Sequence, residues 1–369
     1  MEEERKRILK MIEEGMLSAD EASELLDALD DAEKAQTNGK KIQSDLPSTK
    51  VDWKNGEQHQ KDQNDAHKHS TKDKIFDFID STVKKIKNAD FDFNFGSYKE
   101  VSHIFQYQET PISSFQIEID NGSVDVQTWN ENEIRIECQA KVYKIENYDL
   151  ARAELLKRLK VQMDNDRLNI VLGTKKIKAD FKIFLPNHIY QSSAIKMFNG
   201  PVSLKDLQIP SLKVKTSNGK IHLQQVEGED WEIESMNSNI CLERVKSGKC
   251  EIETMNGSVK VDGEFKKIDS QLMNGNIQGY LRGMATHSGY FKTTTGSIHL
   301  HVPADLAIDG ELKSSIGNVK CHLPNHKVMK SESEVLKKQV HFQSNVESTP
   351  FLYLEAESKT GSVRVNPLK

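Results

Sequence analysis

Histidines and cysteines are the residues of this chain whose spacing comes nearest to a chemical site. His67 with His69, and His299 with His301, alternate so that both rings of a pair would lie on one side of an extended strand, where two imidazoles can share a metal ion. Neither pair is completed to a full ligand set within its own segment. The cysteines follow no CxxC or other metal-ligand spacing: Cys138, Cys241, Cys250 and Cys321. We therefore expect reduced thiols, no bound metal and no cofactor.

The signatures of common enzyme chemistries are missing from the sequence. It contains no GxSxG, HExxH, P-loop or GxGxxG motif. Those motifs position a nucleophile, a metal or a phosphate group, so their absence removes the usual sequence indications of catalysis. We expect a protein that is not an enzyme.

A short repeat dominates residues 100–369 and predicts the fold. Motifs of the form NG-x-[VI]-x-[LV] include NGPVSL at 199–204, NGKIHL at 218–223 and NGSVKV at 256–261, and the corner positions 200, 219, 238, 257, 275, 296 and 317 are 18 to 21 residues apart. Apolar residues alternate inward after each corner, as in a strand that follows a turn. The repeat indicates a mainly β protein, a single-stranded β-solenoid (β-helix) with coils of about 20 residues.

The asparagines of these corners have a structural explanation. An Asn-Gly pair makes a tight turn, because glycine adopts positive φ freely. Stacked coils would place the asparagine amides above one another, so that they hydrogen-bond along the stack. We expect such a structural corner ladder from Asn199, Asn218, Asn237, Asn256 and Asn274.

The outward side chains that follow the corners bear on catalysis. Carbohydrate cleavage by a solenoid would need clustered carboxylates on one face. The residues three positions after each corner form a mixed row without an acidic pair: Asp125, Ser203, His222, Cys241, Lys260, Gln278, His299, Lys320 and Arg364. A carbohydrate-binding or carbohydrate-cleaving solenoid therefore stays the alternative interpretation.

Two gaps interrupt the repeat, between positions 122 and 200 and between 317 and 361. The first gap contains a predicted helix, Asp149 to Leu159, with one apolar face made by Leu150, Ala153, Leu156 and Leu159. A longer repeat also relates residues 180–204 to residues 297–323, each with a strand, a proline turn, a second strand and a glycine corner. We expect degenerate coils with insertions in both gaps.

Residues 1–33 predict a helical hairpin. Apolar residues recur at helical spacing on both sides of Gly15, and Ser18 with Glu21 forms a capping box. The segment contains twelve Asp or Glu and four Lys or Arg, a net charge of −8. So small a unit cannot bury its apolar stripe alone. We expect that stripe to bind a protein partner or a second copy of the chain: Leu17, Leu25, Leu26 and Leu29.

Residues 34–72 are polar and lack hydrophobic periodicity, which predicts a flexible, disordered tether. Residues 73–99 then predict an amphipathic helix followed by a Phe-rich segment. The apolar face of this helix suits either a cap on the end of the solenoid or a membrane surface. Its members are Ile75, Phe76, Ile79, Val83 and Ile86.

Charge and hydropathy limit the partners and the compartment. The net charge is −5 and charged residues make up 29% of the chain, so there is no basic signature for nucleic acid. The sequence shows neither a signal-peptide pattern nor a long apolar span. We expect a cytoplasmic protein, peripheral to the membrane in one interpretation, while non-classical export stays open.

Two sequence features together resemble a known family. They are EEERKRILKMIEEGMLSADEASELLDAL at 2–29 and the serial Asn-Gly corners from 121 onward. The chain resembles the YvlB/LiaX-type proteins of Gram-positive bacteria, which join a short helical module to an adhesin-type β-solenoid. The resemblance implies a cell-envelope stress regulator or scaffold. Its solenoid would restrain or report to a membrane signalling complex, and its N-terminal module would sense or recruit, with membrane surfaces and cationic peptides as further candidate partners.

Overall fold

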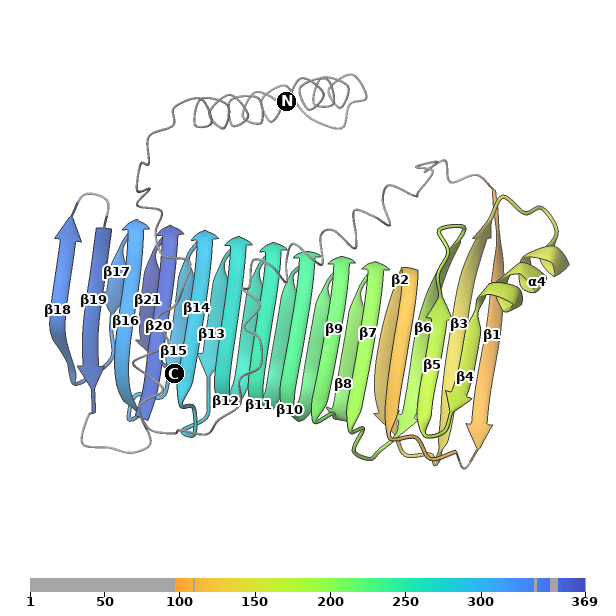
Figure 1. Cartoon of the computed structure of the whole chain (residues 1–369), viewed down its shortest axis with the longest axis horizontal. Helices are drawn as coiled ribbons and strands as arrows, with labels where there is room; N and C mark the ends of the chain where they lie inside the picture. Colours follow the sequence, from red (N-terminus) through yellow and green to blue (C-terminus); the bar gives the residue numbers. More distant parts are fainter. Residues whose placement is uncertain (1–96, 109, 335–336, 346–350, 369) are drawn as a thin grey trace, which may run out of the picture. The chain divides into compact units, whose positions relative to one another are not determined.

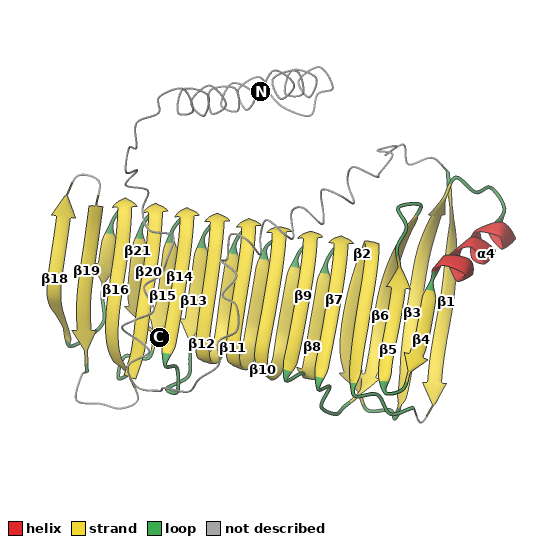
Figure 2. Ribbon diagram, viewed as in Figure 1, coloured by secondary structure: helices red, strands yellow, loops and turns green. Residues whose placement is uncertain are grey.

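The computed structural model describes residues 97–108, 110–334, 337–345 and 351–368. They form strands and one helix (Figure 2). The elements are β1 (Tyr98–Gln108), β2 (Ser114–Trp129), β3 (Glu133–Tyr143), α4 (Tyr148–Arg158), β4 (Lys160–Asp164), β5 (Arg167–Leu172), β6 (Ile177–Pro186), β7 (Ser192–Asn199), β8 (Val202–Gln208), β9 (Ser211–Asn218), β10 (Ile221–Asn237), β11 (Ile240–Asn256), β12 (Val259–Asn274), β13 (Ile277–Leu281), β14 (Ser288–Thr295), β15 (Ile298–Val302), β16 (Ala307–Ile316), β17 (Val319–Cys321), β18 (His326–Glu334), β19 (Lys337–Ser344), β20 (Phe351–Thr360) and β21 (Val363–Pro367).

Each coil of the stack contributes one strand segment to each of two faces. β10 shows the arrangement: its first half pairs in parallel with β8, and its second half pairs in parallel with β9. We call the layer that contains β8 the first face and the layer that contains β9 the second face. Figure 1 shows the parallel strands side by side along the stack. The predicted β-solenoid is confirmed.

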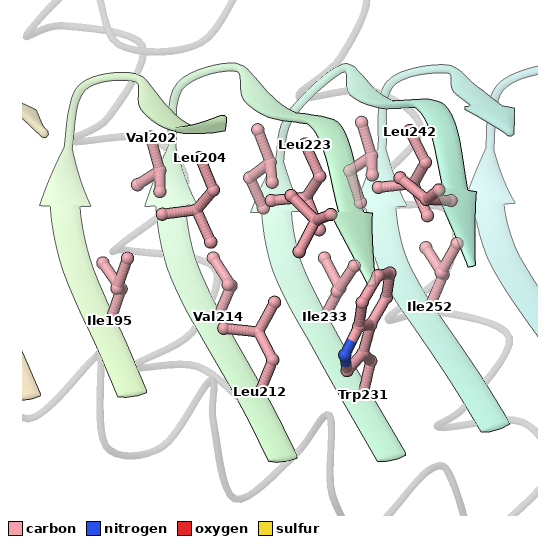
Figure 3. Packing of buried hydrophobic residues seen from close by; sticks show 14 of the residues in the cluster. Ile195, Val202, Leu204, Leu212, Val214, Leu223, Trp231, Ile233, Leu242 and Ile252 are labelled. Carbon is pink, nitrogen blue, oxygen red and sulfur yellow. The ribbon is translucent and has the colours of Figure 1, made fainter. Parts of the chain in front are cut away.

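The apolar side chains of the two faces meet between them. In Figure 3, Val214, Ile233 and Ile252 occupy one inner row on successive strands of the second face. Val202, Ile221 and Ile240 form a matching inner row on the first face. All six are buried, and so is Trp231, which fills the core of its coil. Because each inner residue stacks on its equivalent in the next coil, the core is continuous along the solenoid.

The glycines of the corners stack directly on one another. Gly219 has φ of +135°, and a Cβ there would lie 2.1 Å from the carbonyl oxygen of Gly200 on the preceding coil. Beneath the corners lies a row of buried hydroxyl groups, and Thr216 and Thr254 donate to the carbonyls of Asn218 and Asn256. The tight corner therefore needs glycine for its backbone conformation and for the close approach of the next coil.

The corner asparagines form a hydrogen-bonded ladder. Each amide nitrogen donates to the side-chain oxygen of the preceding asparagine in the stack, over 2.8 to 3.0 Å. The members are Asn121, Asn199, Asn218, Asn237, Asn256 and Asn274. All five residues of the expected ladder are present in it, and Asn121 extends the ladder by one coil although it precedes Asn199 by 78 residues.

We expect Asn237→Ala to lower the free energy of unfolding by about 1–2 kcal/mol, because it removes one hydrogen bond on each side of the ladder. Urea unfolding followed by circular dichroism measures the change. Asn274→Ala is the matched control, since the bond from Asn274 to Asn256 is a single ladder contact, and it should cost about half as much. Equal losses for the two variants would contradict an additive ladder.

The order of the coils in space differs from their order in the sequence. β2 lies between β5 and β7 on the second face and between β6 and β8 on the first. The chain therefore leaves β2, builds β3 to β6 beyond it, and returns to place β7 and β8 on its other side. The first gap in the repeat is this excursion.

A second insertion occupies the other end of the stack. β20 lies between β14 and β16, and β21 lies between β15 and β17. The last coil in the sequence is thus enclosed by two earlier coils. Both insertions involve the longer repeat with its proline turn, which forms β6 to β8 and β15 to β17. In each case the chain passes from one side of the enclosed coil to the other within this repeat.

Antiparallel strands terminate both ends of the stack. β3 pairs with β6 and β1 pairs with β3, while β19 pairs with β16 and β18 pairs with β19. Helix α4 contacts β1 and β3. The expected helix exists, and Leu159 at its C-cap is buried as predicted, but Leu150, Ala153 and Leu156 of the predicted face are exposed. Ala151 and Leu155, one helical turn apart, are buried instead.

Several predictions concern residues outside those that the structure describes. They are the hairpin of residues 1–33 with its leucine stripe, the tether of residues 34–72, and the helix of residues 73–99 up to residue 96. β1 begins at Tyr98, two residues before the expected start of the solenoid at residue 100. Among the described helices, none combines the length and the apolar composition required to span a bilayer.

Candidate functional site

The outward row that follows the corners is continuous along the first face. Backbone pairing aligns Ser203 with His222, His222 with Cys241 and Cys241 with Lys260. At one end of the row the spatial order differs from the order in the sequence, because Arg364 lies between His299 and Lys320. The reason is that β21, which contains Arg364, lies between β15 and β17.

Three possible metal ligands meet in this row. Sγ of Cys241 lies 3.3 Å from Oε1 of Glu243, and Nε2 of His222 lies 3.4 Å from Oε2 of the same carboxylate. The three donor atoms lie within 4.8 Å of one another, and all three residues are half-buried. Histidine, cysteine and carboxylate are all zinc ligands. This cluster is not recognisable in the sequence, because its members come from two coils and become neighbours only when the coils stack.

The surroundings of the cluster favour an ionised carboxylate at Glu243. The hydrogen bond from the Cys241 thiol, followed by the interaction with the His222 ring, lowers the pKa of Glu243. Burial, followed by the Glu243 carboxylate, raises the pKa of Cys241, whereas Lys260 and Lys220 oppose that shift. The thiol therefore keeps its proton and donates it in a hydrogen bond to the ionised carboxylate.

The histidine pair singled out by sequence does not form a comparable cluster. His299 lies in register with Gln278 and Arg364, and burial, followed by Arg364, lowers its pKa. His301 stacks on Tyr280 with ring centroids 4.6 Å apart. The cationic and aromatic neighbours make this pair a poor metal site. The other pair, His67 and His69, lies outside the described residues.

A carboxylate row lies on the second face. Glu232, Glu251 and Asp269 occupy the same register position in three successive coils, and Tyr290 follows in the next. Sequence analysis found no acidic pair on an outer face because it tested only the row that follows the corner. The sequence signal for this row is a carboxylate directly before an inner apolar residue: Glu232 precedes Ile233, and Glu251 precedes Ile252.

Lysines neutralise part of this carboxylate row. Lys213 forms an ion pair with Glu232, and Lys249 lies 2.8 Å from Glu251. Burial raises the pKa of Glu232, but hydrogen bonds with Glu234 and Lys213 outweigh burial and lower it to about 2. Burial raises the pKa of Glu234 beside it. This part of the second face therefore presents paired charges of both signs.

Asp269 is the exception within the row. Burial raises its pKa to about 6, although Gln271 donates a hydrogen bond to it over 3.1 Å. An unfolded aspartate titrates near 3.9. The folded chain therefore binds an additional proton between about pH 4 and pH 6, so this stabilising contribution is present below about pH 4 and is lost as the pH rises through about 6.

We expect Asp269→Asn to raise the free energy of unfolding by roughly 1–3 kcal/mol at pH 7.5, because a neutral amide avoids burial of a charge. The difference from the unmodified protein should vanish near pH 4. Urea unfolding between pH 4 and 8 measures it. Asp230→Asn, at an exposed side chain, should show no such pH-dependent gain. A stability difference that does not change with pH would contradict the assignment.

A cavity of about 230 Å³ opens on the first face between β3, β6, β2 and β8. Its lining includes three carboxylates, of Asp125, Glu137 and Asp180. Ser123 donates to Asp180 over 2.6 Å, and Arg135 lies 2.7 Å from Glu137. Protein groups already pair with two of the three carboxylates, which leaves this cavity less suited to a cation than a set of unpaired carboxylates would be.

A larger groove of about 430 Å³ runs along the bends that join the two faces. We call it the bend groove. It crosses successive coils, and its lining includes Ile189, Pro210, Gly228, Gly248, Phe265 and Gly283. Glu229 passes over Gly248, where a Cβ would lie 2.4 Å from its carboxylate, and meets Lys266 at 3.4 Å. The glycines thus leave room for charged side chains to cross the groove.

Comparison with protein families gives two matches. The family described as Toastrack DUF4097 matches residues 114–347, and a SHOCT-like domain matches residues 3–34. The chain is also similar to the protein YvlB of Bacillus subtilis (strain 168), with 41% identity over 366 residues that cover 99% of both chains.

Solved structures with a similar fold include candidate adhesins from two bacteria. The protein of Bacteroides fragilis NCTC 9343 is 12% identical, and the match covers 73% of this chain and 98% of that one with a TM-score of 0.43. The protein of Parabacteroides merdae ATCC 43184 gives the same identity, coverage and TM-score.

Proposed function

This chain belongs to the Toastrack DUF4097 family and is a YvlB-type protein, as expected from its sequence, and we propose that it is a non-enzymatic scaffold or regulator of the cell-envelope stress response. In this proposal the solenoid binds a partner protein, and residues 1–33 sense or recruit. Membrane surfaces or cationic peptides are further contacts of the N-terminal part.

The bend groove is the observation that supports partner binding best. It extends over several coils and offers charged groups at a regular spacing, with Lys246 near Glu227 and Lys266 near Glu229. Exposed ion pairs of this kind contribute little to stability. The side chains of these ion pairs can instead pair with charged groups of a bound segment. This favours recognition of an extended, charged stretch of another protein.

Charge reversal in the groove tests the proposal. In a Gram-positive host that lacks its own copy, the chain with Lys246→Glu and Lys266→Glu should lose at least about half of its effect on an envelope-stress reporter challenged with a cationic peptide. Lys178→Glu with Lys205→Glu, both exposed on the first face, is the matched control and should retain the effect. An unaltered reporter after deletion of the whole gene would overturn the regulatory role.

Liposome co-sedimentation tests the membrane contact separately. The full chain is compared with a chain that begins at Ser97 and therefore retains β1. We expect anionic vesicles to sediment the full chain and to leave the shorter chain in solution, because the amphipathic helix predicted from the sequence after residue 73 would have an apolar face and lysines near its C-terminal end. Equal behaviour of both chains would remove membrane contact through residues 1–96 from the proposal.

Carbohydrate binding or cleavage is the second candidate function, and the carboxylate row supports it. Glu251, Asp269 and Tyr290 stand in register on successive coils, and the pKa of Asp269 is raised. A carboxyl group of raised pKa beside a second carboxylate is the arrangement of a glycosidase, and an aromatic ring can stack on a sugar. Binding of purified cell-wall polysaccharide, abolished by Asp269→Asn and Tyr290→Ala, would favour this function over the scaffold.

A further inference from the structure

We propose that His222, Cys241 and Glu243 bind a transition-metal ion of the zinc class on the first face, with the fourth coordination position open. The cluster combines the three side-chain types that zinc accepts most readily. It is independent of the bend groove and of the carboxylate row, which lie on other surfaces of the solenoid.

The distances between the donor atoms fit one shared ion. Two nitrogen or oxygen ligands about 2.0–2.1 Å from a tetrahedral ion lie about 3.3 Å apart, and a sulfur at about 2.3 Å lies about 3.5 Å from either. The observed separations are 3.4 Å from Oε2 of Glu243 to Nε2 of His222 and 3.3 Å from Oε1 of the same carboxylate to Sγ of Cys241. One donor atom from each residue lies within 4.8 Å of the other two, so a rotamer adjustment brings the three to the distances of a shared ion.

His222 and Glu243 lie close together without a hydrogen bond between them. Nε2 of His222 is hidden from solvent and makes no hydrogen bond, although Oε2 of Glu243 is only 3.4 Å away. A buried ring nitrogen without a hydrogen-bond partner is costly. A metal ion between the two atoms would satisfy both, since each offers a lone pair toward the other.

The backbone register supplies the geometry. His222 pairs with Cys241, and Gln224 pairs with Glu243, so the four residues occupy the corners of a square on two adjacent coils. Adjacent parallel strands are about 4.8 Å apart, and side chains two residues apart lie on the same face.

Charge balance also agrees with a divalent ion. A thiolate at Cys241 and a carboxylate at Glu243 neutralise two positive charges, while His222 binds as the neutral ring. Binding must release the thiol proton, so we expect the affinity to increase with pH.

Cobalt binding to the purified, untagged full chain tests the site, because Co²⁺ occupies zinc sites and reports a thiolate ligand by a charge-transfer absorption band. We expect one equivalent of Co²⁺ per chain with that band, displaced by Zn²⁺. Cys241→Ser should abolish the band, and His222→Ala and Glu243→Gln should each weaken binding by at least about tenfold.

Control variants separate this site from other metal ligands of the chain. His67→Ala with His69→Ala, and Cys321→Ser, should leave the band unchanged, and circular dichroism shows whether each variant is folded. Cys241→Ala serves as a second thiol-free variant if Cys241→Ser is unstable. Absence of the band, its persistence without Cys241, or unchanged affinity in His222→Ala would each overturn the proposal.

Discussion

Gly219→Ala is expected to lower the free energy of unfolding by more than about 4 kcal/mol, or to prevent folding altogether. Two effects add at this corner. The residue has φ of +135°, which a side-chain-bearing residue rarely adopts, and its new Cβ would lie 2.1 Å from the carbonyl oxygen of Gly200. The clash involves backbone on both sides, so no rotamer change relieves it.

The loss should propagate beyond one corner. Gly219 stacks between Gly200 and Ser238, and neighbouring coils stabilise one another in a repeat protein. We therefore expect a smaller denaturant slope as well as a lower midpoint, since coils on one side can unfold first. Urea unfolding followed by circular dichroism measures both quantities.

Gly173→Ala is the matched control for this prediction. A Cβ at Gly173 meets no atom within 4 Å, so the substitution should change stability by less than about 0.5 kcal/mol. Comparable losses at Gly173 and Gly219 would show that coil contact at the corners is not what requires glycine.

Trp231→Ala is expected to cost about 3–5 kcal/mol, the usual loss for removal of a large buried aromatic side chain. The Trp231 side chain is fully buried, and its Nε1 donates to the carbonyl of Ile209 over 3.0 Å. Backbone pairing places it between Leu212 and Cys250 of the adjacent coils. The substitution would thus leave a cavity that three coils share.

Two further variants test the reason for this loss. Trp231→Phe keeps an aromatic ring but loses the hydrogen bond to Ile209, so its cost should be intermediate. Trp129→Ala removes a half-buried indole and should cost less than Trp231→Ala. Equal costs at positions 129 and 231 would contradict the central packing role of Trp231.

The repeat by itself determined the architecture of a coil. Glycine at positions 200, 219 and 257 predicts corners, and the alternating residues after them predict strands with one buried side. These signals are local, because turn conformation and inward pointing depend on neighbours within a few residues. The asparagine ladder also followed from the repeat, since equal spacing implies equal positions in successive coils.

The sequence did not reveal the sites that depend on two coils. Cys241 and Glu243 are close in sequence, but His222 joins them only through strand pairing. Glu232, Glu251 and Asp269 likewise form a row because one particular register aligns them. In a solenoid, the outward-facing neighbours of a residue come from adjacent coils. A site on the outer surface can therefore be recognised only when the register between the strands is known.

The sequence determined the coil, and the tertiary structure decided the order of the coils. From Gly275 to Gly296 the chain advances 21 residues and moves to the adjacent coil, and from Gly296 to Gly317 it advances another 21 residues but steps over the coil of Gly361. The two steps have equal length although they use different connections, residues 282–287 between β13 and β14 in the first and residues 303–306 between β15 and β16 in the second. Which coil lies next to which depends on pairing between strands that are far apart in sequence. The positions of β2, β20 and β21 in the stack were therefore decided by the tertiary structure.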